Sequence, residues 1–338
     1  MRREILPVGK VPVEVLRKVI LTHIGARRPE VILGPSEGED GAVLRVGDKI
    51  IVSSVDPISG ALEKVGWEAV NISANDVATF GVKPIFFSSC ILLPKKASVE
   101  VVESICGEID SAAKALDMAV IGGHSEITPG LDHPIVVGFS MGITEPGEYV
   151  TSAGARPGDL ILITKHVGLE GASILAADRY NLLRGVMSED SLRIAKEFYR
   201  QISVVKEALL AFDTGGVTAM HDPTEGGLAN GIHELSDASN VGFKVYEEKI
   251  PVASETREIC NFFGIDPLQL ISSGVLLATI RPEFEKRITT LLEKNGVETS
   301  IIGEVLASKE KRIIVRKDGT EAKLIRPLSD HLWKALAK

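Results

Sequence analysis

The alternation of apolar and polar positions along the chain predicts a mixed succession of helices and strands. Residues 13–24 repeat apolar side chains at helical spacing and stop at Gly25. Two β-rich runs follow around a Gly47-Asp48-Lys49 turn, as expected of a hairpin. The elements predicted in this half are helices at 13–24, 62–80 and 98–116 and strands at 42–46, 50–55, 85–93, 119–121 and 134–143.

The stretch EPGEYVTSAGARPGD at 145–159 is rich in turn-forming residues and interrupts this periodicity. We place a domain boundary there, which predicts an N-terminal domain at 1–152 and a C-terminal domain at 153–338. The second half is also mixed, so the fold class is α/β (α+β) with two domains. Its predicted elements are strands at 160–164, 217–220, 243–246, 275–280 and two near 299–316, and helices at 170–183, 190–212, 225–236 and 283–294.

Composition narrows the class of protein. The 338 residues are 44% hydrophobic and 25% charged, which is typical of a globular chain and not of a disordered one. No apolar run is long enough for a transmembrane helix or a signal peptide, so we expect a cytoplasmic protein that does not bind membranes. The net charge of −8 argues against nucleic acid as a partner. An acidic protein that binds a polyanion needs metal ions or helix N-termini to do so.

Several common sites are excluded by their missing motifs. The three cysteines Cys90, Cys106 and Cys260 form no CxxC pair, which excludes a zinc ribbon, and their apolar neighbours predict core positions. Neither a P-loop nor a Rossmann fingerprint is present. Two G-x-S-x-G matches, at Ser36 and Ser140, lack the strand-turn-helix context of a nucleophile elbow.

Carboxylates at predicted strand ends form the first candidate site. Asp40 ends a glycine-rich loop before one strand and Asp56 ends the next, so the two can share a hard cation such as Mg²⁺. The alternative is that both are turn or capping residues. On the following helix, Asn71, Asn75 and Thr79 form a polar stripe beside Asp76, which indicates a metal or phosphate site or else a solvated face.

Two glycine-rich segments carry the remaining candidates. In Gly122-Gly123-His124-Ser125-Glu126-Ile127-Thr128, the double glycine allows a ligand to approach the backbone, and His124, Glu126 and Thr128 alternate on one face. A histidine beside a carboxylate can do acid–base work, unless these are simply polar residues of a turn. In HDPTEGGL, Asp222 precedes Gly226-Gly227 at a predicted helix N-terminus, which suits either a metal-bridged phosphate or an ordinary cap.

Taken together, GEDGAV, VDPI, NISANDVATFGVKP, GGHSE and HDPTEGGL resemble the motifs of the PurM-like superfamily, in the same order. This superfamily includes aminoimidazole ribonucleotide (AIR) synthetase, selenophosphate synthetase, thiamine-monophosphate kinase and the hydrogenase maturation factor HypE. The nearest resemblance is to archaeal HypE-like, AIR-synthase-related proteins. It implies an enzyme that uses ATP and Mg²⁺ to phosphorylate an amide or carbonyl oxygen, or another small-molecule acceptor.

The resemblance also implies roles for particular residues. Metal and phosphate ligands would be Asp40, Asp56, Asp76 and Asp222, with Asn75 beside them, and the catalytic residues would be His124, Glu126 and Asp222. The nucleotide would also meet Gly122, Gly123, Thr128, Gly226 and Gly227. HypE carries its chemistry on a C-terminal cysteine, whereas this chain has Ser-Asp-His-Leu-Trp-Lys-Ala-Leu-Ala-Lys at that place. The alternative expectation is therefore a non-catalytic, ATP-binding maturation or regulatory paralogue of HypE.

A homodimer is predicted through the N-terminal half. Residues 85–93 and 134–143 are apolar on both faces, so the sheet they form must be covered on both. The helices at 62–80 and 98–116 can cover one face, which leaves the other for a second copy or for the C-terminal half. The family resemblance implies the former, with the two N-terminal sheets closing into a β-barrel across the dimer.

Overall fold

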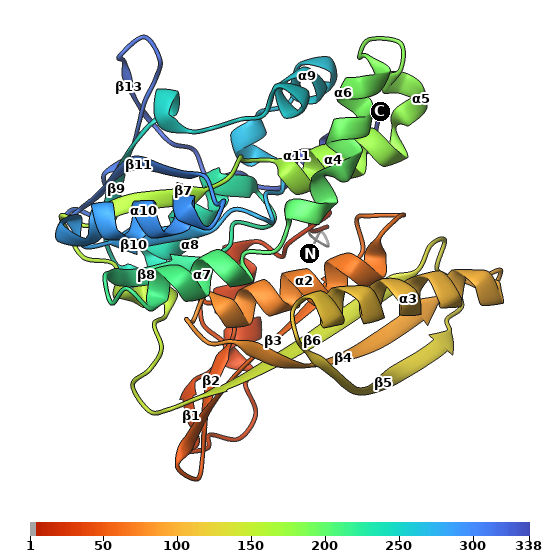
Figure 1. Cartoon of the computed structure of the whole chain (residues 1–338), viewed down its shortest axis with the longest axis horizontal. Helices are drawn as coiled ribbons and strands as arrows, with labels where there is room; N and C mark the ends of the chain where they lie inside the picture. The colour runs from red at the N-terminus through yellow and green to blue at the C-terminus, as the bar shows by residue number, and fades with distance from the viewer. Residues whose placement is uncertain (1–4) are drawn as a thin grey trace.

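The computed structural model describes residues 5–338 and arranges them as two α/β halves, each built on its own sheet (Figure 1). The N-terminal sheet has six strands in the order β1-β2-β3-β6-β4-β5. Neighbouring strands are antiparallel except β4 and β5, which run parallel because a helix connects them. The strands are β1 (Val31–Leu33), β2 (Ala42–Val46), β3 (Lys49–Ile58), β4 (Pro84–Leu93), β5 (Ala119–Ile127) and β6 (Ile135–Thr144).

The two long helices of this half, α2 (Val65–Ala78) and α3 (Val99–Ala115), lie on the face of the sheet that is turned toward the C-terminal half (Figure 1). Every residue of α2 except Trp67 is buried. The helix is therefore enclosed between the sheet and the C-terminal half, and its polar stripe does not face solvent. The alternative of a solvated face for Asn71, Asn75 and Thr79 is wrong.

The opposite face of the N-terminal sheet carries no helix from the described part of the chain (Figure 1). Val55 and Phe139 are paired across β3 and β6 on this face, and Val55 is 61% exposed. Every residue of the edge strand β5 is exposed as well. The C-terminal half packs on the helical side, so within one chain it does not cover this open face.

The C-terminal sheet has seven strands in the order β13-β12-β9-β11-β7-β10-β8, with only β12 and β9 parallel. Alternate residues of β7 face opposite layers: Ile161 and Ile163 pack with α8, whereas Leu162 lies in the core that contains α7 and α10. The strands are β7 (Leu160–Thr164), β8 (Val217–His221), β9 (Gly242–Tyr246), β10 (Leu277–Ile280), β11 (Thr299–Leu306), β12 (Arg312–Val315) and β13 (Glu321–Lys323).

One large apolar core joins the two halves. It contains residues of α2, α3 and β4, such as Phe87 and Ile105, together with Leu175 of α4 and Ala208 of α7. The helices outside the N-terminal sheet are α1 (Val13–Lys18), α4 (Leu169–Asp178), α5 (Tyr180–Leu183), α6 (Glu189–Lys196), α7 (Val205–Phe212), α8 (Gly227–Ser239), α9 (Ser254–Phe263), α10 (Glu285–Lys294) and α11 (His331–Leu336). Within residues 5–338, no helix combines the length and apolarity needed to cross a membrane.

The structure corrects several predicted elements. The helix predicted at 13–24 ends at Lys18 and continues only as a 3₁₀ turn, because none of its residues is buried against the protein. The helix predicted at 190–212 is divided into α6, a 3₁₀ segment and α7. Helices α9 and α11 were not predicted at all. Cys106, predicted in the core, is exposed on α3, whereas Cys260 is buried.

Candidate functional site

A cavity of about 620 Å³ lies between the two halves, within the size range of small-molecule sites. Its walls come from the end of β3, from α2, α4 and α11, and from residues 8–11. Residues 8–11 belong to the segment before α1, called the N-terminal arm below. Carboxylates dominate the polar part of the wall. They are Glu39, Asp40, Asp56, Glu68, Asp76, Glu170, Glu225 and Asp330.

Three of the predicted metal ligands meet on this wall. Asp40 precedes β2, Asp56 lies near the end of β3, and Asp76 projects from α2. The Ser54 hydroxyl donates to Asp76 Oδ2 at 2.5 Å, and the Thr79 hydroxyl donates to Asp40 Oδ2 at 3.2 Å. Asp40, Asp56 and Asp76 therefore lie on one wall of the cavity, and their role as ligands stays a prediction.

Asp222, directly after β8, is the fourth predicted ligand and lies beside Asp40. Its side chain is buried, at 1% exposure, and neither carboxylate oxygen has a hydrogen-bond partner. Among the described residues, Asp40, His221 and Asp222 form one group whose possible ligand atoms lie within 4.8 Å of one another. A buried, unpaired carboxylate is costly, and a bound divalent cation removes that cost. The carboxylates of Asp40 and Asp222 therefore fit Mg²⁺, which takes oxygen ligands.

The alternative of a helix cap for Asp222 is wrong. Helix α8 begins at Gly227 with no side-chain cap at its N-terminus. The Gly226 N–H donates to Asp330 instead, at 2.5 Å. Gly226 has a φ of +82°, and a Cβ at Gly227 would lie 2.4 Å from the Leu270 carbonyl oxygen. The double glycine is thus required by backbone conformation and close packing, and its contact with a nucleotide stays a prediction.

His221 connects Asp40 to a second carboxylate. Its Nδ1 lies 2.6 Å from Asp40 Oδ1 and its Nε2 lies 3.1 Å from Glu234 Oε2. Burial alone would lower the pKa of His221, but Asp40 and Glu234 outweigh burial and raise it to about 10. The imidazole is therefore protonated at neutral pH, so in the ligand-free protein it offsets carboxylate charge and does not act as a base.

Burial raises the pKa of three of the aspartates, whereas on its own it would lower the pKa of His221. Desolvation raises the pKa of Asp76 and of Asp222 well above the ordinary value, and it raises that of Asp56. The mutual repulsion of the clustered carboxylates adds to the shifts of Asp76 and Asp222. A divalent cation bound among these carboxylates would favour their ionised forms and so lower these pKa values.

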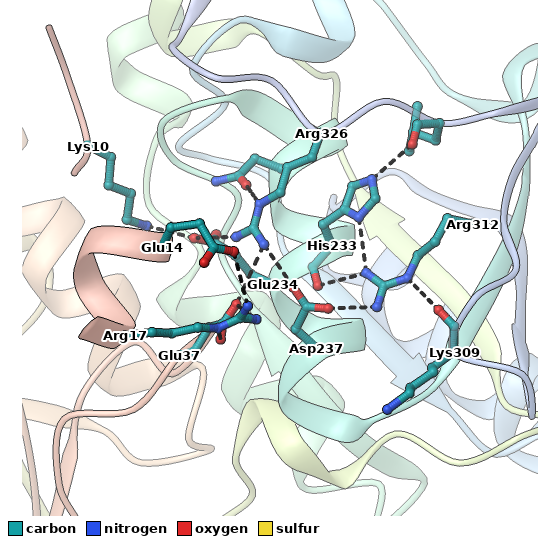
Figure 2. Close-up of polar contacts among 12 residues, drawn as sticks. Lys10, Glu14, Arg17, Glu37, His233, Glu234, Asp237, Lys309, Arg312 and Arg326 are labelled. Atoms are coloured by element: carbon teal, nitrogen blue, oxygen red, sulfur yellow. Dashed lines mark hydrogen bonds and ion pairs between the residues drawn. The ribbon is translucent and has the colours of Figure 1, made fainter. Parts of the chain in front are cut away.

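The N-terminal arm is held against α8 by a network of charged side chains (Figure 2). Lys10 Nζ donates to Glu234 Oε1 at 3.1 Å, and Arg17 pairs with Glu37 at 2.6 Å. Arg326 lies between Glu37, Glu234 and Asp237, and it pairs with Asp237 at 2.8 Å (Figure 2). These contacts place residues 8–11 along one wall of the cavity.

Asn75, a predicted nucleotide ligand, joins the two halves of the molecule. Its Nδ2 donates to the Ile202 carbonyl and its Oδ1 accepts from the Val204 N–H, both at 2.7 Å. Both polar ends of this buried side chain are therefore occupied by the C-terminal half. Its neighbour Asn71 donates only to the Trp67 carbonyl of its own helix.

The predicted residues of the GGHSE segment lie apart from the cavity. The segment is not a loop after a short strand, as predicted, but the middle of the long edge strand β5. A Cβ at Gly123 would lie 2.2 Å from the Ser89 carbonyl oxygen, so glycine is needed for close approach to β4. His124 and Thr128 both contact Glu126 on one exposed face, as the alternation predicts. Gly122, Gly123, His124, Glu126 and Thr128 do not line the cavity, and their functional roles stay predictions.

Sequence reasoning missed part of this site. His221 and Glu234 are separated by thirteen residues, and only the pairing of β8 with α8 shows that they meet. Glu68 and Glu170 are isolated acidic residues in the first turns of α2 and α4, where an acidic residue usually stabilises the helix dipole. The available signal was that both helices are otherwise almost free of charged residues.

We expect the thermal stability of the ligand-free protein to fall as the pH rises from about 5 to about 7.5. Burial raises the pKa of Glu170 and of Asp330 to about 7. In this window both carboxyls are protonated in the folded protein and ionised in the unfolded chain, so raising the pH costs up to about 3 kcal/mol for each. Calorimetry of the wild type and Glu170→Gln measures this, and the variant should show a shallower slope. Equal slopes would contradict the assignment.

The fold and the order of these motifs are matched by a known family. Residues 38–144 match the model described as AIR synthase related protein, N-terminal domain, and residues 156–316 match that of its C-terminal domain. The chain belongs to the AIR synthase-related family. The prediction of a PurM-like, HypE-like protein is thereby confirmed, and so is the two-domain α/β fold class.

Two curated relatives illustrate where the chain lies within the AIR synthase-related family. A hydrogenase expression/formation protein of Methanocaldococcus jannaschii is 29% identical over 314 residues, which cover 91% of this chain and 90% of the relative. Carbamoyl dehydratase HypE of Rhizobium leguminosarum is 27% identical over 281 residues, covering 80% and 77%.

Solved structures of HypE proteins share the fold of this chain. Hydrogenase maturation protein HypE in complex with ATP superposes with a TM-score of 0.73 and 21% identity, covering 98% of each chain. A HypE–HypF complex gives a TM-score of 0.75 and 22% identity, covering 93% of this chain and 99% of that one. The second structure records a protein partner for that HypE that we did not predict for this chain.

Proposed function

We propose that this protein is an ATP- and Mg²⁺-dependent enzyme that transfers a phosphoryl group to an amide or carbonyl oxygen, or to another small-molecule acceptor. The observation that carries the proposal is Asp222, a fully buried carboxylate without a hydrogen-bond partner, which lies beside Asp40 on the wall of the acidic cavity but does not itself line it. The family relationship supports it, because a HypE of the same fold is known in complex with ATP.

The roles of the residues follow from their positions. Asp40, Asp56, Asp76 and Asp222 would hold Mg²⁺, which when bound neutralises phosphate charge and so allows an acidic protein to bind ATP. Protonated His221, whose Nδ1 lies 2.6 Å from Asp40 Oδ1, would hold that carboxylate in place. Residues 8–11 of the N-terminal arm form one wall of the cavity that would hold the nucleotide.

Calorimetry with Mg-ATP tests the first part of the proposal, and ADP release with amide, aldehyde and phosphomonoester acceptors tests the second. We expect binding that requires Mg²⁺ and ADP release that depends on one acceptor class. Mg-ATP binding without turnover on any acceptor would favour a non-catalytic paralogue. Absence of nucleotide binding would refute the proposal.

We further propose a homodimer through the open face of the N-terminal sheet, with the domain boundary near residue 152. The support is the row of apolar side chains on this face, including Val55, Phe139 and Ile143, which no other part of the described chain covers. A twofold axis would bury the face of each copy against the other. It would also bring β5, with His124 and Glu126, into an interface.

We expect Val55→Lys to convert the dimer to a monomer, because burying a charged side chain within the interface without a partner for its charge is costly. Light scattering at micromolar concentration measures the mass. Val186→Lys is the matched control, since Val186 has nearly the same exposure, 60%, on the C-terminal half. A monomeric wild type, or a Val55→Lys dimer, would be the opposite result.

A further inference from the structure

A second group of carboxylates lines the cavity at a distance from the aspartates. Glu68 lies eight residues before Asp76 on α2, which corresponds to about 12 Å along the helix axis. Glu170 of α4 is close enough to Glu68 for its charge to raise the pKa of Glu68, an effect second to burial. Both glutamates are buried, at 2% and 3% exposure, and both lie on the cavity wall.

Polar atoms at this end of the cavity lack partners. Glu68 Oε2 and the Ser273 hydroxyl are fully buried and make no hydrogen bond in the structure. Glu170 Oε2 accepts only the Ser273 N–H, at 3.2 Å. Within residues 5–338, no lysine or arginine forms a salt bridge with Glu68 or Glu170. Groups of this kind are normally satisfied in a folded protein, so they indicate a ligand with hydrogen-bond donors.

The spacing of the oxygen atoms at this end of the cavity favours an organic cation over a metal ion. In the described part of the chain, only Asp40, His221 and Asp222 bring three possible ligand atoms within 4.8 Å of one another. Glu68 and Glu170 lack a third such residue, so they do not form a cage for a bare ion. A nitrogen cation with several N–H donors can span two carboxylates and a hydroxyl that lie further apart.

We propose that Glu68, Glu170 and Ser273 bind a positively charged nitrogen group of the acceptor, an ammonium or a guanidinium. The proposal rests on the phosphoryl-transfer function above and specifies its substrate class. The acceptor would then carry both a cationic group and the oxygen that receives phosphate. Ile174 and Leu332, which line the same cavity, provide apolar surface for the carbon chain between them.

Binding of methylguanidinium to the full-length protein tests this directly, with neutral methylurea as the matched probe. We expect methylguanidinium to bind the wild type more tightly than methylurea does, and about tenfold more weakly to Glu68→Gln and Glu170→Gln. Glu103→Gln is the control, because Glu103 is an exposed carboxylate on α3 outside the cavity. Asp222→Asn should leave this binding unchanged, which separates the glutamate site from the aspartate cluster.

Three results would overturn the proposal. The first is that methylurea and methylguanidinium bind equally well. The second is that Glu68→Gln binds methylguanidinium as tightly as the wild type does. The third is that Glu68→Gln loses a bound Mn²⁺, which would assign the glutamates to a metal site. Mg-ATP affinity is measured on the same variants and should not change. If Mg-ATP binds and methylguanidinium does not, only the cation site is refuted, whereas absence of Mg-ATP binding refutes the phosphoryl-transfer function.

Discussion

Replacing Asp222 by asparagine should weaken Mg-ATP binding about 100-fold while leaving the ligand-free protein at least as stable as the wild type. The loss corresponds to about 3 kcal/mol for a charged ligand that becomes neutral. Stability is retained because burial raises the pKa of Asp222 well above that of the unfolded chain, so its charge destabilises the folded state at neutral pH. Asparagine removes that charge and keeps the shape of the side chain.

Calorimetric titration and thermal unfolding of the same samples measure both quantities. Asp132→Asn, at an exposed position outside the cavity, is the matched control and should behave as the wild type. A lowered melting temperature with unchanged Mg-ATP affinity would show instead that Asp222 has a structural role.

The second large effect is expected for Asn75→Ala, which should lower the free energy of unfolding by about 4 kcal/mol and the melting temperature by about 5 °C. The change leaves the Val204 N–H and the Ile202 carbonyl without their partner in a region that is fully buried. Each unsatisfied group costs about 1–3 kcal/mol.

Asn71→Ala provides the comparison, because Asn71 is equally buried on the same helix but bonds only within it. We expect that variant to lose about 1 kcal/mol. Thermal unfolding with Mg-ATP titration distinguishes the two roles of Asn75. If Asn75→Ala weakens nucleotide binding but leaves the stability unchanged, Asn75 acts as a nucleotide ligand and not as a hydrogen-bonded contact between the two halves.

The sequence indicated which aspartates belong to the candidate site, but not which residues of the other half contact them. Asp40, Asp56 and Asp76 follow one another within a single domain, so local elements determine where they lie. The meeting of Asp222 with Asp40 is a contact between the halves, and the family resemblance was needed to anticipate it. No role was predicted for His221, which joins Asp40 to Glu234, because both carboxylates are distant from it in the chain.

The predictions that failed have a common physical cause. Local periodicity cannot show whether a polar residue on a buried helix faces solvent or another domain, and Asn75 faces another domain. Local patterns also misplaced the end of β5. The strand predicted at 119–121 continues through the double glycine to Ile127, because Gly123 allows close packing against Ser89. Conversely, the apolar pattern of β4 and β6 correctly indicated a sheet with more apolar surface than one set of helices can cover.

The enclosure of α2 has a consequence for synthesis on the ribosome. This helix packs on the N-terminal sheet with one side and on the C-terminal half with the other, so its burial is complete only after the C-terminal half has been made. Until then, a nascent chain that has folded its N-terminal sheet presents two apolar surfaces, the outer side of α2 and the open face of the sheet. Such a chain is a substrate for chaperones, and its aggregation should depend on the rate at which the second half is translated.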